Sequence, residues 1–361
     1  MTADYGIGPG GAETEKRKRE HIDTVLNADV GAKGITTGFD RFFFDHVALP
    51  EFALADVDLS TTLFGRKLAA PILISSMTGG TSAAHDININ LAAAAQACGV
   101  AMGLGSQRAA LEDEALSYSY QVRSVAPEIL LFANLGAVQL NYGYGVDQAR
   151  RAVEMIEADA LFLHLNPLQE AVQAEGDSIW RGLFNKIEAL VRDISVPVVV
   201  KEVGNGISAD VAKRLAYCGV AAIDVAGAGG TSWSEVEAYR QSDDLRRRIA
   251  HAFAGWGIPT ALALNDVHNA LPDMPVFASG GIRSGIDMAK AIRLGAALCG
   301  VAAPALGDAA RDSEAVVSGL SAFIEELRIA AFCAGAPDLR SLRRAKLRHH
   351  ADWSLVDCPP V

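Results

Sequence analysis

The stretch ALFLHLNPLQE, Ala160–Glu170, contains the pattern that decides the fold. Its first half is almost wholly apolar, as in a β-strand that is buried on both faces of a parallel sheet. Its second half turns polar over a few residues, with the side chains His164, Asn166, Gln169 and Glu170. The stretch therefore predicts a buried strand that delivers chemically useful groups at its carboxyl end.

The same pattern recurs along the chain. Short apolar runs rich in β-branched residues alternate with helical patterns, which predicts a parallel sheet covered by helices on its outer face. Eight such units close into an α/β fold of the (β/α)₈ (TIM) barrel type. The predicted strands lie in PILISSM from Pro71, GVAMGLG from Gly99, ILLFANL from Ile129, ALFLHLN from Ala160, PVVVKEV from Pro197, AAIDVAG from Ala221, PVFASGG from Pro275 and LCGVAAP from Leu298.

No Pro/Ser-rich linker and no shift in composition divides the 361 residues, so the barrel is expected to dominate one large domain. We expect the barrel in residues 71–340, an N-terminal extension of residues 1–70 that packs on it, and a C-terminal tail in residues 341–361. Residues 228–257 form a polar insertion before the seventh strand. It is expected to be a loop over the barrel mouth.

The composition predicts a soluble, cytoplasmic protein. Its five cysteines are scattered and never in CxxC spacing, which favours neither disulfides nor a zinc site. The chain has no apolar signal core and no run of about 18 apolar residues, so no membrane partner is expected. The net charge of -11 disfavours nucleic acid, but a local positive site can still hold a small phosphorylated ligand.

Every predicted strand ends in small or polar residues, and active sites of (β/α)₈ barrels lie at these ends. Gly280 and Gly281 lead into a helix that Ser284 can cap. The segment GVAAP, Gly300–Pro304, follows at the next strand and lets another backbone approach closely. Free backbone N–H groups here predict a phosphate site, as in many barrels.

Lys201 is the most informative charge at this end. It follows four residues of an apolar strand, so it either pairs with an acid or faces a charged ligand. A salt bridge to Glu202 is the alternative, but adjacent strand residues point to opposite faces. We therefore favour a ligand contact for Lys201.

Taken in order, the strand ends resemble those of the type 2 isopentenyl diphosphate isomerases, FMN-dependent enzymes with a (β/α)₈ fold. The match runs from RKREH at Arg17 through SSMTGGT, GLGSQR, FANLGAVQL, HLNPLQEAVQAEGD, VVKEVGNGIS, AGAGGTSW and ASGGIRSGID, and so covers most of the chain. The family usually shows Q-P-E-G-D where this chain has QAEGD, Gln173–Asp177. This change alters loop stiffness and removes no chemical group.

The resemblance implies FMN across the barrel mouth, with the flavin phosphate at the site predicted above. Lys201 would face the N1/O2 edge of the ring, where negative charge collects on reduction. The implied FMN contacts are Ser75, Ser76, Met77, Thr78, Ser106, Asn134, Lys201, Thr231, Gly281, Ile282, Arg283, Ala302 and Ala303.

The resemblance also implies a small-molecule diphosphate substrate. Arg17 and His21 are four residues apart and share a helix face. A solvated basic helix is the alternative, because glutamates are interspersed, whereas a diphosphate would gain charge-assisted hydrogen bonds. The implied substrate contacts are Arg17, Lys18, His21, Ser106, Gln107, Arg108, His164, Asn166 and Gln169.

Glu170 would ligate Mg²⁺, which prefers one or two carboxylates completed by water and substrate phosphate oxygens. The implied catalytic residues are His164, Gln169 and Lys201. For His164 the alternative is a buried histidine of the core. Gln169 occupies the family's position for proton transfer, yet a neutral amide has no useful pKa near 7.

The implied reaction converts isopentenyl diphosphate into dimethylallyl diphosphate, with one proton added at C4 and one removed from C2. No electrons are gained overall, so the resemblance implies reduced FMN as an acid/base group and NAD(P)H, either NADH or NADPH, as the initial reductant. Two proton routes stay open, one through flavin N5 alone and one that includes Gln169. A homo-oligomer, a tetramer or an octamer, is expected from the family.

Two alternatives have different functions. A 2-hydroxy acid oxidase needs a His/Arg pair after strands six and seven, but residues 226–250 contain no histidine, and an IMP dehydrogenase-like enzyme needs a loop cysteine, which no strand-end loop provides. A non-catalytic flavin-binding protein would not need the polar set that the chain keeps, which is His164, Asn166, Gln169, Glu170 and Lys201.

Overall fold

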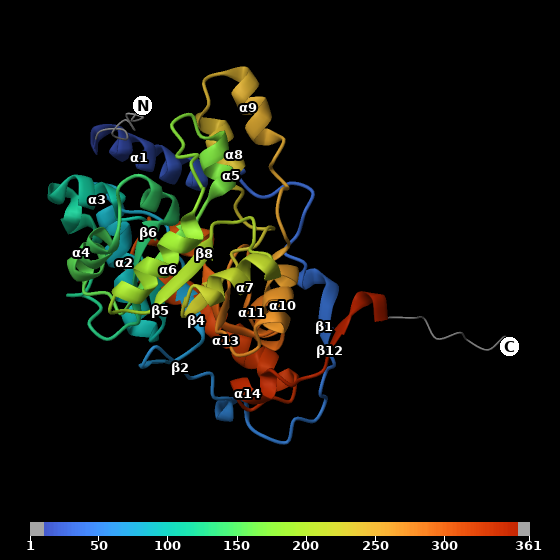
Figure 1. The fold of residues 1–361 in the computed structure, drawn as a ribbon. Coiled ribbons are helices and arrows are strands. Elements are labelled where there is room, and N and C mark those ends of the chain that lie inside the picture. Colours follow the sequence, from blue (N-terminus) through green and yellow to red (C-terminus); the bar gives the residue numbers. More distant parts are fainter. Residues whose placement is uncertain (1–10, 353–361) are drawn as a thin grey trace, which may run out of the picture.

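A closed barrel forms the centre of the fold (Figure 1). The computed structural model describes residues 11–352. Eight parallel strands close in the order β10-β11-β4-β5-β6-β7-β8-β9, and each coincides with one predicted apolar run, which confirms the (β/α)₈ fold. The strands are β4 (Ile72–Ile74), β5 (Ala101–Gly103), β6 (Leu131–Gly136), β7 (Ala160–Leu165), β8 (Val198–Glu202), β9 (Ala222–Asp224), β10 (Val276–Ala278) and β11 (Ala296–Val301).

Helices cover the outside of the barrel. Four of them, α2, α7, α11 and α13, begin at side-chain caps. At α7, Ser208 accepts a hydrogen bond from the N–H of Val211, and at α11, Ser284 accepts one from the N–H of Asp287. The helices that follow the strands are α2 (Ser82–Cys98), α3 (Arg108–Glu112), α4 (Val146–Ile156), α5 (Pro167–Val172), α6 (Leu183–Asp193), α7 (Ala209–Tyr217), α10 (Thr260–Ala270), α11 (Gly285–Arg293), α12 (Ala303–Ala309) and α13 (Ser313–Cys333).

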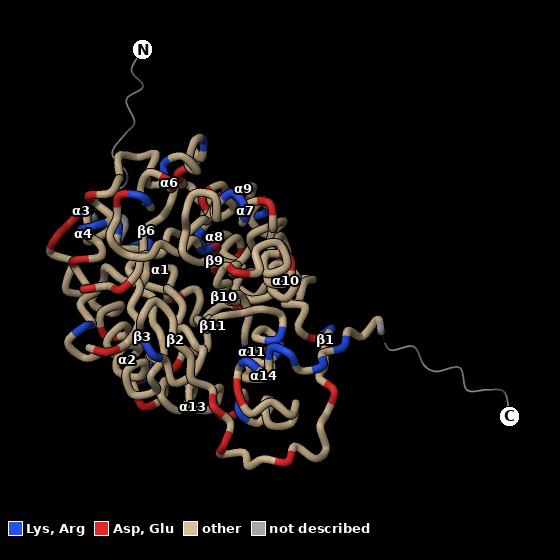
Figure 2. The backbone as a smooth tube through the Cα atoms, turned by 60° about the horizontal axis from the view of Figure 1, so that its bottom comes forward, with Lys and Arg blue, Asp and Glu red and all other residues tan. Residues whose placement is uncertain are grey.

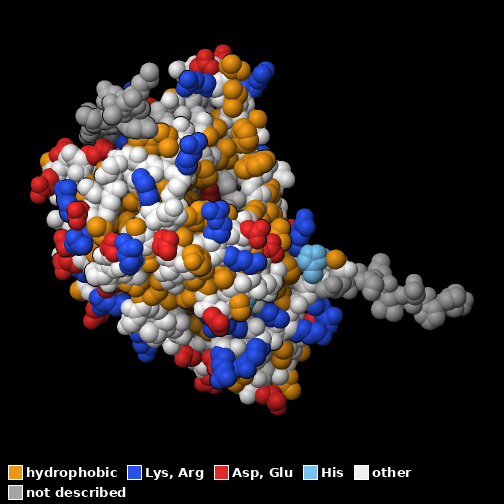
Figure 3. All heavy atoms as spheres, in the orientation of Figure 1, with side chains coloured by type: hydrophobic (Ala, Val, Ile, Leu, Met, Phe, Trp, Pro, Cys, Tyr) orange, Lys and Arg blue, Asp and Glu red, His pale blue; other side chains and the backbone are white. Residues whose placement is uncertain are grey.

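The insertion before β10 is largely helical, so the prediction of a loop was wrong. It contains α8 (Trp233–Arg240) and α9 (Asp244–His251), and Asp243 caps α9 by accepting the N–H of Arg246 at 2.8 Å. A dense polar composition hid these helices, because α9 has few apolar positions from which to read a helical period. Figure 3 shows apolar side chains gathered at this projecting part of the surface.

The barrel interior contains two layers of opposite chemistry. The lower layer takes one apolar, fully or almost fully buried side chain from each strand: Leu73, Ala101, Phe132, Phe162, Val199, Ala222, Phe277 and Leu298. Two residues farther along each strand the side chain again points inward. This upper layer consists of Ser75, Gly103, Asn134, His164, Lys201, Asp224, Ser279 and Gly300. The upper layer lies at the carboxyl end, where the active site is expected.

The amino end of the barrel is closed by a hairpin of β2 (Thr61–Leu63) and β3 (Arg66–Leu68), which Figure 2 shows crossing this side. Leu68 joins the lower layer, and the Phe64 ring lies edge-on to Phe132 at 6.3 Å. Arg66 and Arg123 both pair with the Asp159 carboxylate, at 2.6 and 3.0 Å. This end is therefore plugged, and the charges of Arg66 and Arg123 are paired with that of Asp159.

A strand of the N-terminal extension and a strand of the C-terminal tail pair beside the barrel. Strand β1 (Phe42–Phe44), from the N-terminal extension, pairs antiparallel with β12 (Leu347–His349), from the C-terminal tail (Figure 1). Helix α14 (Leu339–Leu342) precedes β12, and α1 (Gly11–Asn27) lies against α8 at the barrel mouth. No helix among residues 11–352 is both long and apolar enough to span a bilayer.

Candidate active site

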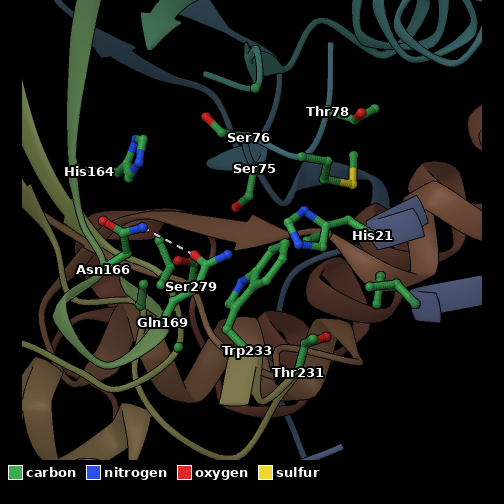
Figure 4. A pocket seen from close by; sticks show the side chains of 18 of the residues that line it. His21, Ser75, Ser76, Thr78, His164, Asn166, Gln169, Thr231, Trp233 and Ser279 are labelled. Atoms are coloured by element: carbon green, nitrogen blue, oxygen red, sulfur yellow. Dashed lines mark hydrogen bonds between the residues drawn. The ribbon is translucent and has the colours of Figure 1, made fainter. Parts of the chain in front are cut away.

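A cavity opens at the carboxyl end of the strands, above the upper layer. With its opening to solvent it has a volume of about 1750 Å³. Side chains from the strand ends, from α1 and from α8 surround it (Figure 4). It brings together the predicted residues Arg17, Lys18, His21, Ser75, Ser76, Met77, Thr78, Ser106, Arg108, Asn134, His164, Asn166, Gln169, Glu170, Lys201, Thr231, Gly281, Ile282, Arg283, Ala302 and Ala303.

Gln107 is the predicted site residue that does not line the cavity. Its side chain is fully buried, donates from Nε2 to the Ala152 carbonyl at 2.8 Å and accepts the Asn134 N–H at 3.0 Å. The predicted substrate contact of Gln107 is therefore not supported by its position. The turn after β5 sends Gln107 outward toward α4, and the sequence pattern of a loop does not reveal such a direction.

His164 and Asn134 form a pair in the upper layer. His164 Nδ1 lies 2.8 Å from Asn134 Oδ1, and because this oxygen can only accept, Nδ1 carries the proton. Burial, assisted by the charge of Lys201, lowers the pKa of His164 to about 3. His164 is therefore a neutral imidazole with a fixed tautomer, whose Nε2 is left as an acceptor.

Lys201 does not form the salt bridge to Glu202 that was the alternative to a ligand contact. Its Nζ donates to the Glu202 backbone carbonyl at 2.6 Å, and no carboxylate of the described residues lies within ion-pair distance. The Glu202 carboxylate points away and accepts the N–H groups of Val203, Gly204 and Asn205. The Lys201 cation thus lies at the cavity without a neutralising contact.

The predicted metal ligand is held in place by its own loop. Asn166 Nδ2 donates to Glu170 Oε1 at 2.8 Å, and the Asp177 N–H donates to Oε2 at 2.6 Å. A Cβ at Gly176 would come within 1.8 Å of the Glu170 carbonyl oxygen, so only glycine allows this turn. Burial raises the pKa of Glu170, and the hydrogen bonds from Asp177 and Asn166 offset this rise only in part.

Asp177 links three strand-end loops. Its Oδ2 accepts Arg108 Nη1 at 2.7 Å and Gln139 Nε2 at 2.9 Å, while its backbone N–H binds Glu170. Arg108 pairs with Glu112 as well, at 2.8 Å. Arg108 is therefore already oriented by two carboxylates at the edge of the cavity.

Glu237 of α8 is a site residue that sequence reasoning missed. Although fully buried, its carboxylate lies 2.9 Å from His21 Nε2, 3.0 Å from Gln169 Nε2 and 2.6 Å from Arg240 Nη1. Burial alone would raise the pKa of Glu237, but the hydrogen bond from His21 and the charge of Arg240 bring it down to about 2. Glu237 thus ties the N-terminal helix to the loop after β7.

The roof of the cavity comes from α1 and α8. Lys18 Nζ donates to the Ser106 carbonyl at 3.0 Å and to the Tyr120 hydroxyl at 2.6 Å. Burial, followed by the charge of Arg17, lowers the pKa of Lys18 to about 7. The rings of His21 and Trp233 meet edge to face at 5.2 Å and lie side by side in Figure 4. Trp233 ends the matched stretch AGAGGTSW but was not singled out, and Tyr120 lies in no motif that marks it in the sequence.

Glycines shape the predicted phosphate site. Gly280 and Gly281 have φ values of 95° and 84°, in the left-handed region that favours glycine. A Cβ at Gly230 would lie 2.5 Å from the Gly281 nitrogen, so the loops after β9 and β10 pack backbone against backbone. Helix α11 then begins after Ser284, and this arrangement suits an anion.

Unpartnered polar atoms show that the cavity fits a polar ligand. Ser75 Oγ, Ser76 Oγ and Asn166 Oδ1 are buried without a hydrogen-bond partner among the described residues. Natural proteins leave few such atoms unless a ligand or water satisfies them. The described residues contain no cluster of three or more metal-binding side chains, so a cation at Glu170 would need oxygens from water or substrate.

Comparison with known proteins gives the family. Residues 12–121 and 149–349 match the family described as FMN-dependent dehydrogenase. The chain is 62% identical to an isopentenyl-diphosphate delta-isomerase of Synechocystis sp. over 92% of this chain and 96% of that protein. The chain belongs to the isopentenyl-diphosphate delta-isomerase family. An isomerase of that name from Stutzerimonas stutzeri is 59% identical over 92% of this chain and 96% of its own. The resemblance read from the strand ends is thereby confirmed.

Solved structures support the fold at lower identity. A mandelate oxidase variant with (S)-mandelic acid has a TM-score of 0.65 and 21% identity, covering 94% of this chain and 98% of its own. Mandelate oxidase with 3,3-difluoro-2-hydroxy-3-phenylpropionic acid has a TM-score of 0.62 and 20% identity over 94% and 99%. At this level of identity the similarity concerns the fold alone.

Proposed function

We propose that this protein catalyses the FMN- and Mg²⁺-dependent isomerisation of isopentenyl diphosphate to dimethylallyl diphosphate, without net redox. The observation that carries the proposal is family membership at 62% identity over nearly the whole chain. The cavity supports it, because nearly all residues implied for cofactor, metal and substrate line one space. When bound, reduced FMN supplies an electron-rich ring that can exchange a proton next to the substrate double bond.

The cofactor proposal rests on the upper layer and the glycine loops. Asn134, His164 and Lys201 of the upper layer line the cavity and would contact the bound flavin, and Ser75 and Ser76 have hydroxyls without a partner there. Gly281, Ile282 and Arg283, with Ala302 and Ala303, would hold the single FMN phosphate at the ends of β10 and β11. Met77, Thr78, Ser106 and Thr231 would complete the contacts.

The substrate proposal rests on the cations at the rim. Arg17, Lys18 and Arg108 line the cavity from α1 and from the start of α3. They would bind the diphosphate by charge-assisted hydrogen bonds, with His21 beside them. Glu170 would share one Mg²⁺ with the phosphate oxygens, and Asn166 fixes the carboxylate for that role by its 2.8 Å hydrogen bond.

Gln169 is held at both ends of its amide. Asn166 Nδ2 donates to its Oε1 at 3.2 Å, and its Nε2 donates to the ionised Glu237 at 3.0 Å (Figure 4 shows the first bond). A neutral amide in a fixed orientation positions the reacting carbon better than it carries protons. We therefore assign Gln169 the positioning role, and His164 that of a neutral acceptor beneath it.

The proposal extends to the reductant, the oligomeric state, the location and the domain organisation of the protein. NAD(P)H would act as the initial reductant of the FMN, and the protein would assemble as a homo-oligomer in the cytoplasm. Residues 1–70 would act as an extension that contributes α1 to the site, residues 71–340 as the barrel, and residues 341–361 as a tail. Size-exclusion chromatography with light scattering would test the assembly.

A single-reduction experiment tests the proposed function. The FMN-loaded enzyme is reduced once with dithionite without oxygen, and Mg²⁺ and isopentenyl diphosphate are added. Because substrate and product have the same oxidation level, hundreds of dimethylallyl diphosphate molecules per flavin are expected with no further reductant. Product that stops at one equivalent per flavin, or that needs stoichiometric NAD(P)H, would instead indicate an oxidoreductase.

A further inference from the structure

Asp224 is a buried acid of the upper layer that the proposed reaction does not use. Its side chain is fully buried at the end of β9. Oδ1 accepts the Ser279 hydroxyl at 2.7 Å and the Ala226 N–H at 3.2 Å, while Oδ2 is buried without a partner among the described residues. A buried carboxylate with a free oxygen is costly to folding, so its presence in the upper layer, next to the cavity-lining residues Lys201 and Ser279, calls for a function.

The strand register places Asp224 next to Lys201. These two residues are Cα partners in the β8–β9 ladder, and both are inward-facing members of the upper layer. Neighbouring strands are about 4.8 Å apart, so the two side chains are neighbours at the floor of the cavity. No direct ion pair forms, because Lys201 Nζ donates to the Glu202 carbonyl instead. The charges of Asp224 and Lys201 thus both contribute to the electrostatic potential above the upper layer, although the two side chains form no ion pair.

The surroundings of Asp224 have opposing effects on the pKa of its carboxyl group. Burial raises the pKa of Asp224, whereas the charge of Lys201 and the hydrogen bond from Ser279 act to lower it. Because Asp224 and Lys201 are both buried, the field of a charge on one of them is only weakly screened at the other. An ionised Asp224 would therefore offset part of the positive potential that Lys201 creates above the floor.

We propose that Asp224 is a positioning residue that acts through Lys201, and that its negative charge limits how strongly the floor stabilises the reduced form of bound FMN. The inference rests on the proposed FMN-dependent function. An acid/base cofactor must both give and take a proton in every cycle. Lys201 alone would favour the anionic form of the reduced flavin, whereas Asp224 beside it would keep both the anionic and the neutral form accessible.

The test is the reduction potential of FMN bound to Asp224→Asn, measured by equilibration with a redox dye. The substitution keeps the shape and an oxygen for Ser279, and it removes the negative charge. We expect the equilibrium constant for reduction to rise at least tenfold, which is about 30 mV for a two-electron couple. Asp210→Asn is the control, since it makes the same change in net charge on a side chain that is 96% exposed. Its potential should equal that of the wild type.

The outcomes separate this inference from the function on which it rests. A wild-type protein that binds no FMN overturns both. FMN binding with equal potentials for wild type and Asp224→Asn, or a lower potential for the variant, overturns the role of Asp224 and leaves the proposed function intact. If Asp224→Asn does not fold or bind FMN, Ser279→Ala is measured instead. Loss of its hydrogen bond to the carboxylate should shift the potential in the same direction by a smaller factor, and an unchanged potential would overturn the inference.

Discussion

The lower and upper layers of the barrel interior lie only two residues apart on the same eight strands, yet they differ in every chemical respect. The lower layer is wholly apolar, and its Phe132 and Phe162 rings stack at 4.4 Å. The upper layer has six polar side chains and two glycines, and two of its oxygen-bearing side chains, Ser75 and Asp224, keep a buried atom without a partner. One layer holds the barrel together, and the other gives up stability for a binding surface.

Physical chemistry explains why the two layers must be adjacent. Burying an apolar side chain of this size contributes about 1.5–3 kcal/mol to folding, whereas a buried polar atom without a partner costs about 1–3 kcal/mol. The upper layer, with its unpartnered polar atoms, is compatible with a stable fold only because burial of the lower layer offsets its cost in free energy. The upper layer is thus a rigid platform, and its groups are oriented before any ligand arrives.

The largest effect is expected from truncating one side chain of each layer on the same strand, β6. Phe132→Ala should lower the free energy of unfolding by about 3–5 kcal/mol, because it opens a cavity in the packed lower layer. Asn134→Ala, two residues along β6, should cost about 1–3 kcal/mol and should also weaken FMN binding, since it frees His164 from its 2.8 Å hydrogen bond. Denaturant unfolding and FMN titration measure both. Equal stability losses, or FMN affinity that falls only in Phe132→Ala, would refute the division into layers.

The sequence predicted the two layers unequally. The eight apolar runs identified every strand of the barrel, because strands buried on both faces have almost no polar residues to confuse the pattern. Their polar ends located Asn134, His164 and Lys201. Asp224 and Ser279 were not singled out, since a single Asp or Ser at a strand end is also typical of an ordinary turn.

Contacts between distant segments could not be predicted from the sequence. The hairpin β2–β3 and the β1–β12 pair consist of three-residue strands, which are too short to show a period. Glu237 meets His21 across 216 positions of the chain, so no local pattern links them. The position of the Gln107 side chain could not be predicted for a related reason, because the direction of a side chain after a strand depends on the turn that follows.

The next largest effect is expected on isomerase activity, from a substitution of Glu170 in the loop after β7. Glu170→Gln keeps the shape of the side chain and removes the charge that would hold Mg²⁺, so isomerase activity should fall by at least about a hundredfold, beyond the range of outer-shell changes. FMN binding should be unchanged, because the floor is intact. Glu175→Gln is the control, on the same loop with a side chain 33% exposed. Near-normal turnover with unaltered Mg²⁺ dependence in Glu170→Gln would show that the carboxylate is structural.

A smaller effect of pH on substrate affinity is expected from Lys18, which lies on α1 above the cavity. The pKa of Lys18 is about 7 in the free protein, so Lys18 is charged below pH 7 and loses its proton above it. A bound diphosphate would favour the charged form and raise this pKa. Substrate affinity should therefore be flat just below pH 7 and fall by up to about tenfold per pH unit above it.

Lys18→Arg provides the control for this pH effect, because a guanidinium stays charged throughout the range. Isothermal titration with substrate and Mg²⁺ at several pH values gives the slope. The variant should bind with little change between pH 6 and 9. The same slope in wild type and variant would assign the titration to another group.

For His164 in the upper layer we expect no change of protonation between pH 5 and 8. The pKa of His164 is lowered to about 3, so this ring should stay neutral across the range in which an exposed histidine ionises. Proton–nitrogen NMR of histidine-labelled protein, assigned with His164→Gln, would follow it. Shifts of the His164 ring nitrogens that move between pH 5 and 8 would mean that the layer is open to water.

The identity of the cofactor tests the central claim most directly, which is that the upper layer and the glycine loops at β10 and β11 form a site for FMN. Heat releases the cofactor from purified or reconstituted protein, and chromatography identifies and quantifies it. We predict FMN at one molecule per chain, because the site at Gly280 and Gly281 offers one phosphate cradle and the sequence contains no Rossmann fingerprint for an adenine half. Recovery of FAD, or no flavin after reconstitution, would contradict the account.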